Sequence, residues 1–177
     1  MSGERWEFEE WRGALGRLAP GAAVLVGLAA AERIAGVLGP EGGPVAELLD
    51  ACWGGDAPER IRALSDAVEE RAAAYEEDAL DPEDGDEVLP EDAAMLPIDA
   101  FTAAVEAAGA CAGGPWDGAL RSLQTVAMGA PDPVAELHRQ RADLTLAGAA
   151  GDAWAEVADQ LRERARRDAE GFAAGGG

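Results

Sequence analysis

His138 is the only histidine of the chain, and it limits the chemistry that the sequence can support. It lies in ELHRQR, between charged residues, which predicts a solvent-facing position on a helix. Nucleophilic catalysis by a Ser–His or Cys–His pair would depend on this one side chain. A di-iron bundle needs two Glu-x-x-His motifs, and because residue 135 is alanine not even one is complete. The sequence therefore predicts no catalytic residues, no metal and no cofactor.

Two cysteines, Cys52 and Cys111, each lie inside an apolar helical pattern. They lack the Cys-x-x-Cys spacing of a zinc site. A buried free cysteine packs as a small hydrophobic residue, so we interpret both as reduced core thiols of a cytoplasmic protein. The first 19 residues contain four glutamates and two tryptophans, unlike the short basic start of a signal peptide, which also favours the cytoplasm.

Acidic side chains are concentrated in residues 69–92. Twelve of these 24 residues are acidic and only Arg71 is basic, so the segment carries -11 of the net charge of -21. Gly85 and Glu91 suggest an EF-hand loop, but Leu80 and Pro82 stand where the first two ligands should be. The motif therefore fails, and a loose, weak cation site is the alternative that stays open.

The acidic segment has two main interpretations. It is either a solvated loop that keeps the protein soluble or a surface that binds a basic protein. Like charges packed together repel, and a basic partner would relieve that repulsion. The arginines of the last helix, folding near the loop, are an internal alternative. The candidate partner-binding carboxylates are Glu76, Glu77, Asp78, Asp81, Glu83, Asp84, Asp86 and Glu87.

The segment 20–38, PGAAVLVGLAAAERIAGVL, is apolar on every face until Glu32 and Arg33 interrupt it. A helix that is apolar all round is covered by other helices or spans a membrane. Charges near a helix centre are costly in a membrane, and much of the segment is only weakly hydrophobic alanine and glycine. We therefore predict the buried central helix of a soluble bundle.

Glu32 and Arg33 are adjacent, so on a helix they point about 100° apart and do not pair with each other. Each needs a partner from another helix, and Asp50 or Asp99 is the expected partner of Arg33. The alternative is a polar ligand pocket formed by Glu32, Arg33, Asp50 and Asp99.

The remaining periodicity predicts an all-α fold, a single-domain bundle of seven or eight helices around the central helix 20–38. We expect this domain over residues 1–174, with an acidic loop at about 80–92 and a flexible tail at 175–177. The tryptophans are expected to anchor the core, and Val134, Leu137 and Leu144 to face inward. Apolar residues recur at helical spacing in segments 2–18, 45–52, 58–79, 93–112, 115–126, 133–144 and 152–172.

Four short islands occur in the order AERI at 31–34, LLDACW at 48–53, LPIDA at 96–100 and SLQTVAM at 122–128. In this order they resemble the YjaG-like bacterial family of unknown function. The resemblance runs from about Leu18 to Phe172 and implies a single all-helical domain, without an activity. The sequence departs from the family where Gly36 and Val37 follow the Glu-Arg pair, in place of an aromatic residue and a proline.

The strongly negative net charge limits which kinds of partner the protein can bind. A net charge of -21 and a pI of about 4.2 disfavour direct contact with nucleic acid phosphates or anionic membranes. We therefore predict a non-enzymatic acidic domain that binds a basic protein partner, as an immunity or inhibitor-type protein would. A small-molecule or cation binder with a pocket near Glu32 and Arg33 is the alternative, and an enzyme with a carboxylate acid/base pair there is the third hypothesis.

Overall fold

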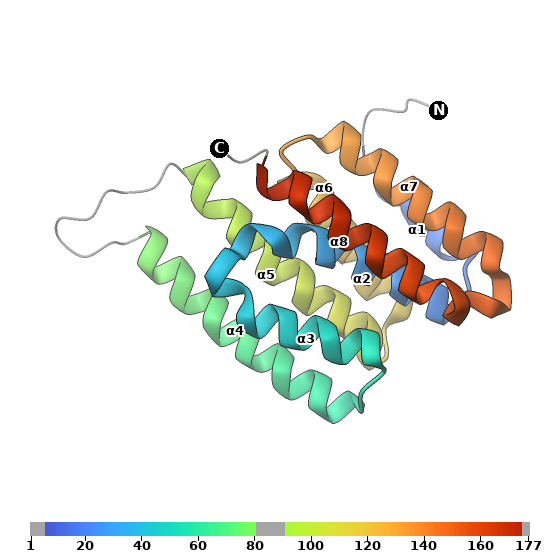
Figure 1. Ribbon diagram of the computed structural model, residues 1–177, viewed down its shortest axis with the longest axis horizontal. Coiled ribbons are helices and arrows are strands. Elements are labelled where there is room, and N and C mark those ends of the chain that lie inside the picture. Colours follow the sequence, from blue (N-terminus) through green and yellow to red (C-terminus); the bar gives the residue numbers. More distant parts are fainter. Residues whose placement is uncertain (1–5, 81–90, 175–177) are drawn as a thin grey trace.

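The computed structural model describes residues 6–80 and 91–174, and the regular structure in these ranges is entirely helical, which confirms the all-α prediction (Figure 1). The 3₁₀ helices are η1 (Gly36–Gly42) and η2 (Gly151–Val157). The α-helices are α1 (Phe8–Leu15), α2 (Pro20–Ala35), α3 (Gly43–Gly54), α4 (Pro58–Leu80), α5 (Glu91–Ala112), α6 (Pro115–Gly129), α7 (Pro133–Ala150) and α8 (Ala158–Ala174).

Some helix boundaries differ from the sequence prediction. The central helix ends at Ala35 rather than at 38, because the glycine-rich chain tightens into η1 and Gly39 adopts a positive φ of 50° before Pro40. Helix α1 covers Phe8–Leu15 of the predicted 2–18, of which residues 2–5 lie outside the described residues. Helix α5 begins at Glu91, two residues before the predicted segment 93–112, and continues through Pro97. The predicted tail 175–177 and most of the predicted acidic loop, residues 81–90, lie outside the described residues.

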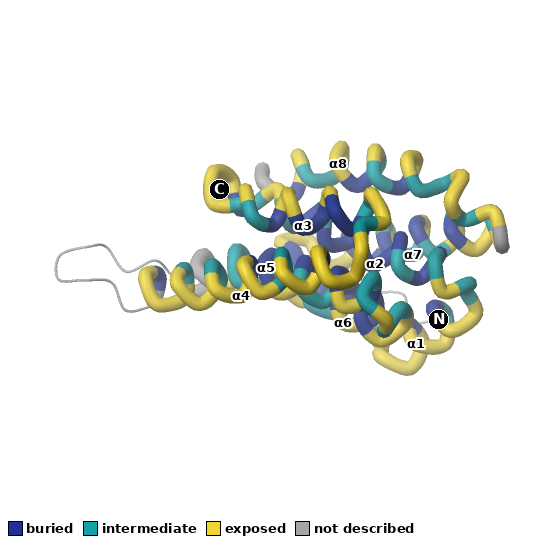
Figure 2. Tube along the Cα trace, turned by 90° about the horizontal axis from the view of Figure 1, so that it is seen from below, coloured by how far each residue is buried: buried dark blue, intermediate teal, exposed yellow. Residues whose placement is uncertain are grey.

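Helix α2 forms the centre of the molecule. It packs against α3, α5, α6, α7 and α8, and Figure 2 shows it between α8 on one side and α6 on the other. Its side chains are buried around its whole circumference; Ala23, Val26, Leu28, Ala30 and Ile34 are all 0% exposed. A helix apolar on every face needs this cover, and the prediction of a buried central helix is confirmed.

Two segments are long and apolar enough to cross a membrane by length and composition, Pro20–Gly54 and Met95–Ala112. In the first, 67% of the apolar window is buried inside the protein, and in the second 39%. Burial of the first by neighbouring helices is the pattern of a core helix in a soluble protein.

Glycines allow the helices around α2 to approach closely. A Cβ at Gly27 would lie 2.9 Å from the Cα of Ala119, and the Gly27 carbonyl accepts a hydrogen bond of 3.1 Å from the Ser122 hydroxyl. A Cβ at Gly118 would lie 2.7 Å from the backbone oxygen of Glu106. Both contacts involve backbone atoms, which cannot rotate away as a side chain can.

Gly118→Ala is therefore expected to destabilise the fold, because α5 and α6 must separate to admit the methyl group. Overpacking of this kind costs about 1–3 kcal/mol. Gly171 is the matched control, since it lies in α8 with no atom near its Cβ position, and Gly171→Ala should stabilise by about 0.5–1 kcal/mol. Urea unfolding of both variants measures the difference, and equal midpoints would contradict the close approach at Gly118.

Candidate functional site

Arg33 is the largest buried charged side chain of the described residues, with 0% exposure. Its Nη2 and Nε donate to Glu136 Oε1 at 2.7 and 3.1 Å, and its Nη1 donates to Asp143 Oδ2 at 2.6 Å. Burial alone would lower the pKa of Arg33, but the two carboxylates raise it above its ordinary value, so the side chain stays charged. The guanidinium thus joins α2 to α7 through two carboxylates at once.

Further charged side chains surround Arg33, Glu136 and Asp143 and supply the positive charge that the second carboxylate needs. Arg164 of α8 lies 3.0 Å from Asp143 and donates to the Arg139 carbonyl oxygen at 3.1 Å. Arg139 lies 3.8 Å from Glu136 and 3.9 Å from Asp168. Burial raises the pKa of Asp143, and the guanidiniums of Arg33 and Arg164 oppose that rise. Three arginines and three carboxylates therefore form one network across α2, α7 and α8, which we call the Arg33 network.

The sequence prediction of the inner face of α7 was wrong in part. Glu136, Gln140 and Asp143 are each 0% exposed, whereas Val134, expected to face the core, is 41% exposed. The helix is rotated so that its polar side chains meet Arg33, and Gln140 donates to the Leu123 carbonyl oxygen at 2.9 Å. Spacings of four and three residues place these polar groups on one face, which was the available signal, although a solvated helix face has the same pattern.

The predicted partners of Arg33 were also wrong. Asp50 and Asp99 do not contact it, because the inner face of α7 supplies its carboxylates instead. The four residues of the predicted pocket therefore do not line one site. Arg33 is buried in the core, whereas Glu32 faces α3 and α8. Glu136 and Asp143, which the sequence analysis missed, are neutralised by arginines and inaccessible to a substrate.

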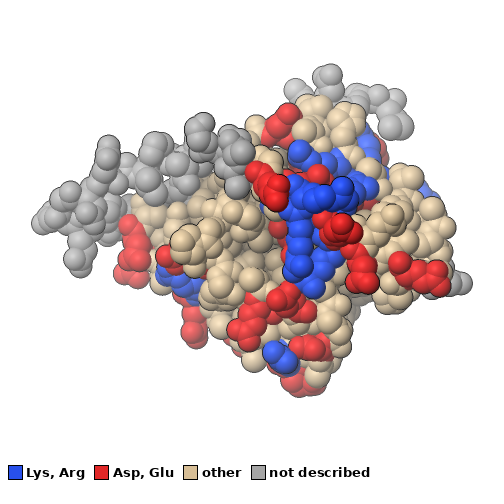
Figure 3. Space-filling model, viewed as in Figure 1, with Lys and Arg blue, Asp and Glu red and all other residues tan. Residues whose placement is uncertain are grey.

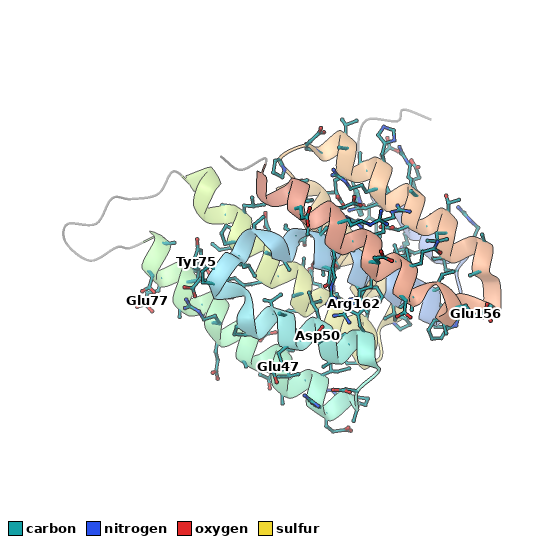
Figure 4. The ribbon with its side chains drawn as sticks, viewed as in Figure 1. Glu47, Asp50, Tyr75, Glu77, Glu156 and Arg162 are labelled. Atoms are coloured by element: carbon teal, nitrogen blue, oxygen red, sulfur yellow. The ribbon has the colours of Figure 1, made fainter. Side chains whose placement is uncertain are left out.

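Glu32 and Asp50 do come together, as part of a surface cluster with two arginines of α8. Glu32 accepts from Trp53 Nε1 at 2.8 Å and from Arg166 Nε at 2.8 Å. Asp50 pairs with Arg162 and Arg166, and the Arg162 guanidinium lies over the Trp53 ring at 5.6 Å. Figure 3 shows arginine side chains gathered over α8 with acidic groups around them, and Figure 4 shows Arg162 pointing toward Asp50. This cluster ties α8 to α2 and α3.

Asp99 lies apart from both groups. It packs against Gly129 of α6, where a Cβ would collide with its carboxylate, and it is half-buried. Burial raises the pKa of Asp99. Burial also raises the pKa of Glu106, one of whose oxygens accepts a hydrogen bond of 2.8 Å from Thr125.

Three of the eight candidate partner-binding carboxylates lie in the described residues. Glu76, Glu77 and Asp78 are exposed near the end of α4. Figure 4 shows Glu77 at one end of the helical body formed by the described residues. The other five, Asp81, Glu83, Asp84, Asp86 and Glu87, lie outside the described residues.

The histidine, the cysteines and the tryptophans named in the sequence analysis are the remaining candidates. His138 is exposed, as predicted. The thiols of Cys52 and Cys111 meet between α3 and α5, and their hydrogen bond together with burial raises the pKa of Cys52. Trp11 is buried as a core anchor, but Trp116 is 41% exposed, so the tryptophans are not all in the core. Within the described residues, no group of three or more His, Cys, Asp or Glu side chains could hold a metal ion.

Comparison of the chain with models of protein families, with curated proteins and with solved structures finds no match. The resemblance to the YjaG-like family therefore stays a prediction. The candidate sites are argued from the geometry of the described residues alone.

Arg33→Met is expected to destabilise the protein by about 3–5 kcal/mol, because it leaves Glu136 and Asp143 buried with only the partly exposed arginines beside them. Urea unfolding measures the loss. Arg17 is exposed, so the matched substitution Arg17→Met should change the unfolding free energy by no more than about 0.5 kcal/mol. Equal midpoints for the two variants would show that the Arg33 network does not hold the fold together.

The raised pKa values of Asp99 and Glu106 predict that mild acidification stabilises the protein. The folded state takes up these protons at a higher pH than the unfolded state, so stability is gained as pH falls from 7 toward the ordinary carboxyl values of about 4. Urea midpoints at pH 7, 6 and 5 measure this gain. The Asp99→Asn, Glu106→Gln variant should show a smaller gain, and an unchanged gain would contradict the assignment to these two groups.

Proposed function

We propose that the protein is a non-enzymatic cytoplasmic domain that binds a basic protein through the acidic end of α4, defined by Glu76, Glu77 and Asp78. The observation that carries the proposal is the placement of three exposed carboxylates, consecutive in sequence, at the end of α4, where Figure 4 shows Glu77 at one end of the described helical body. An immunity or inhibitor-type role suits this arrangement, since such proteins present a charged surface and need no catalytic residues.

The local structure makes these charges unfavourable in the isolated protein. The C-terminal end of a helix carries a partial negative charge, so nearby anions destabilise it and nearby cations stabilise it. The last turn of α4 has no basic residue. Arg71 lies earlier in the helix and pairs with Glu41 of η1. A basic partner would supply the missing positive charge.

The internal alternative receives less support. The arginines Arg162, Arg164 and Arg166 of α8 pair with carboxylates of α2, α3 and α7. These arginines therefore hold α8 against α2, α3 and α7, and their charge does not neutralise the end of α4. The solvated-segment alternative differs from our proposal in predicting no specific partner.

The experiment compares three forms of the full chain as baits in extracts of the cells that make the protein. The test variant Glu76→Gln, Glu77→Gln, Asp78→Asn neutralises the acidic end of α4. We expect the wild-type chain to retain a basic protein that the test variant loses, with an association rate that falls steeply as salt is added. Removing three anions from a helix C-terminus should also raise the urea midpoint of the free protein.

The matched control is Glu59→Gln, Asp117→Asn, Glu156→Gln, which makes the same change in net charge at exposed sites elsewhere. Glu156 lies at the opposite end of the long axis from Glu77 (Figure 4). The control should retain the partner as the wild-type chain does. If the three forms retain the same proteins, or the control loses the partner as fully as the test variant, binding does not depend on the acidic end of α4 and the proposal is wrong.

A further inference from the structure

A cavity of about 410 Å³ opens between α4, α5 and α6, away from the acidic end of α4. Its apolar lining comes from Ile61, Val105, Ala108 and Ala112. The volume is in the range of sites that take small organic ligands, which usually combine an apolar wall with a few polar groups. Here the polar lining is Arg62, Ser65, Glu69, Glu106 and Arg121.

The two arginines are the unusual part of this lining. In a chain of net charge -21, most of the described arginines pair with carboxylates, as the Arg33 network and the surface cluster illustrate. Arg62 and Arg121 come from different helices, are exposed and line the same cavity, and among the described residues neither has a carboxylate oxygen within 4.0 Å. Glu106 accepts a hydrogen bond from Thr125, and the charge of Arg121 favours its ionised form. Guanidinium groups bind carboxylates through paired hydrogen bonds, so two of them at one cavity suit an anionic head group.

Gly109 leaves the α5 side of the cavity without a side chain at that position. It lines the cavity from within α5, and no atom lies within 4 Å of the position of a Cβ there. Glycine inside a helix is less stable than alanine, and at Gly27 and Gly118 close backbone contact explains it. At Gly109, as at Gly171 of α8, no such contact exists among the described residues, so a side chain at Gly109 would enter open space beside the cavity.

We propose that this cavity binds a small monocarboxylate with an apolar body, its carboxylate held by Arg62 and Arg121 and its body against Ile61, Val105 and Ala108. A single negative charge fits better than a phosphate dianion, because Glu69 and Glu106 line the same cavity. Gly109 provides the room for the ligand. The site is separate from the acidic end of α4 and does not depend on the function proposed there.

Octanoate is the probe, titrated into the full chain by calorimetry. Octanamide tests the need for the charge, acetate the need for the apolar body, and octyl phosphate the preference for a monoanion. We expect one octanoate to bind per chain, and octanamide, acetate and octyl phosphate to bind about tenfold more weakly or not at all. Absent octanoate binding, or equal affinity for octanamide, would overturn the proposal.

Two pairs of matched variants locate the site. Arg62→Gln, Arg121→Gln should weaken octanoate binding about tenfold or more, whereas Arg17→Gln, Arg167→Gln removes the same charge from arginines outside the cavity and should not. Gly109→Leu should abolish binding while raising the urea midpoint, because it fills the cavity and favours the helix. Gly171→Leu, in open space on α8, should raise the midpoint and leave binding intact. Octanoate bound equally by wild-type and Gly109→Leu chains would show that it binds elsewhere.

Discussion

The buried guanidinium of Arg33 is the constraint on which the arrangement of the helices depends. A charge taken out of water is costly unless its hydrogen bonds and its charge are fully met, and here Glu136 and Asp143 meet both. Because these carboxylates come from one face of α7, and Arg164 reaches Asp143 from α8, the pairing is satisfied in only one register of the three helices. Sliding or rotating α7 would leave a buried charge without its partner, and that cost adds to the loss of apolar packing.

The small residues of α2 and its neighbours complement this constraint. Burying a helix on every side requires its neighbours to approach closely, and Gly27, Ala119 and Gly118 remove the side chains that would hold them apart. Arg33 lies on the side of α2 that faces α7 and α8, and it is 0% exposed, so its ion pairs form away from water, where they are stronger. Close packing therefore holds α2 against α6, while ion pairs hold it against α7 and α8.

The fold was predictable from the sequence to the extent that it depends on local patterns. Helical periodicity and the glycine and proline boundaries located the helices, and the apolar run of twelve residues, 20–31, before the first charges of α2 could only be buried or membrane-spanning. Periodicity shows which residues share a face but not which faces meet. Glu136 is 103 residues from Arg33 in the chain, and in ELHRQR it looks like a solvated charge. The sequence analysis therefore predicted that Arg33 needs a partner from another helix but not which partner. The same limit applies to the cavity beside Gly109, since Arg62 and Arg121 lie on helices whose pairing no local pattern reveals.

The charges of the molecule divide into two physical regimes. In the Arg33 network of α2, α7 and α8 the charges are paired, and Arg33, Glu136 and Asp143 are buried, so their contribution is to define one packing of these helices. At the end of α4 they are exposed and screened by salt over a Debye length of about 8 Å. Helix α4 has 23 residues and is about 35 Å long at 1.5 Å per residue, so its acidic end extends well away from Asp56, which pairs with Arg60 in its first turn. The arginines of the Arg33 network already pair with the carboxylates of that network, so they do not offset the charge at the end of α4. The two regimes can therefore change independently: a substitution in the Arg33 network alters the packing of the helices, whereas a substitution at the end of α4 alters the field that an approaching molecule meets.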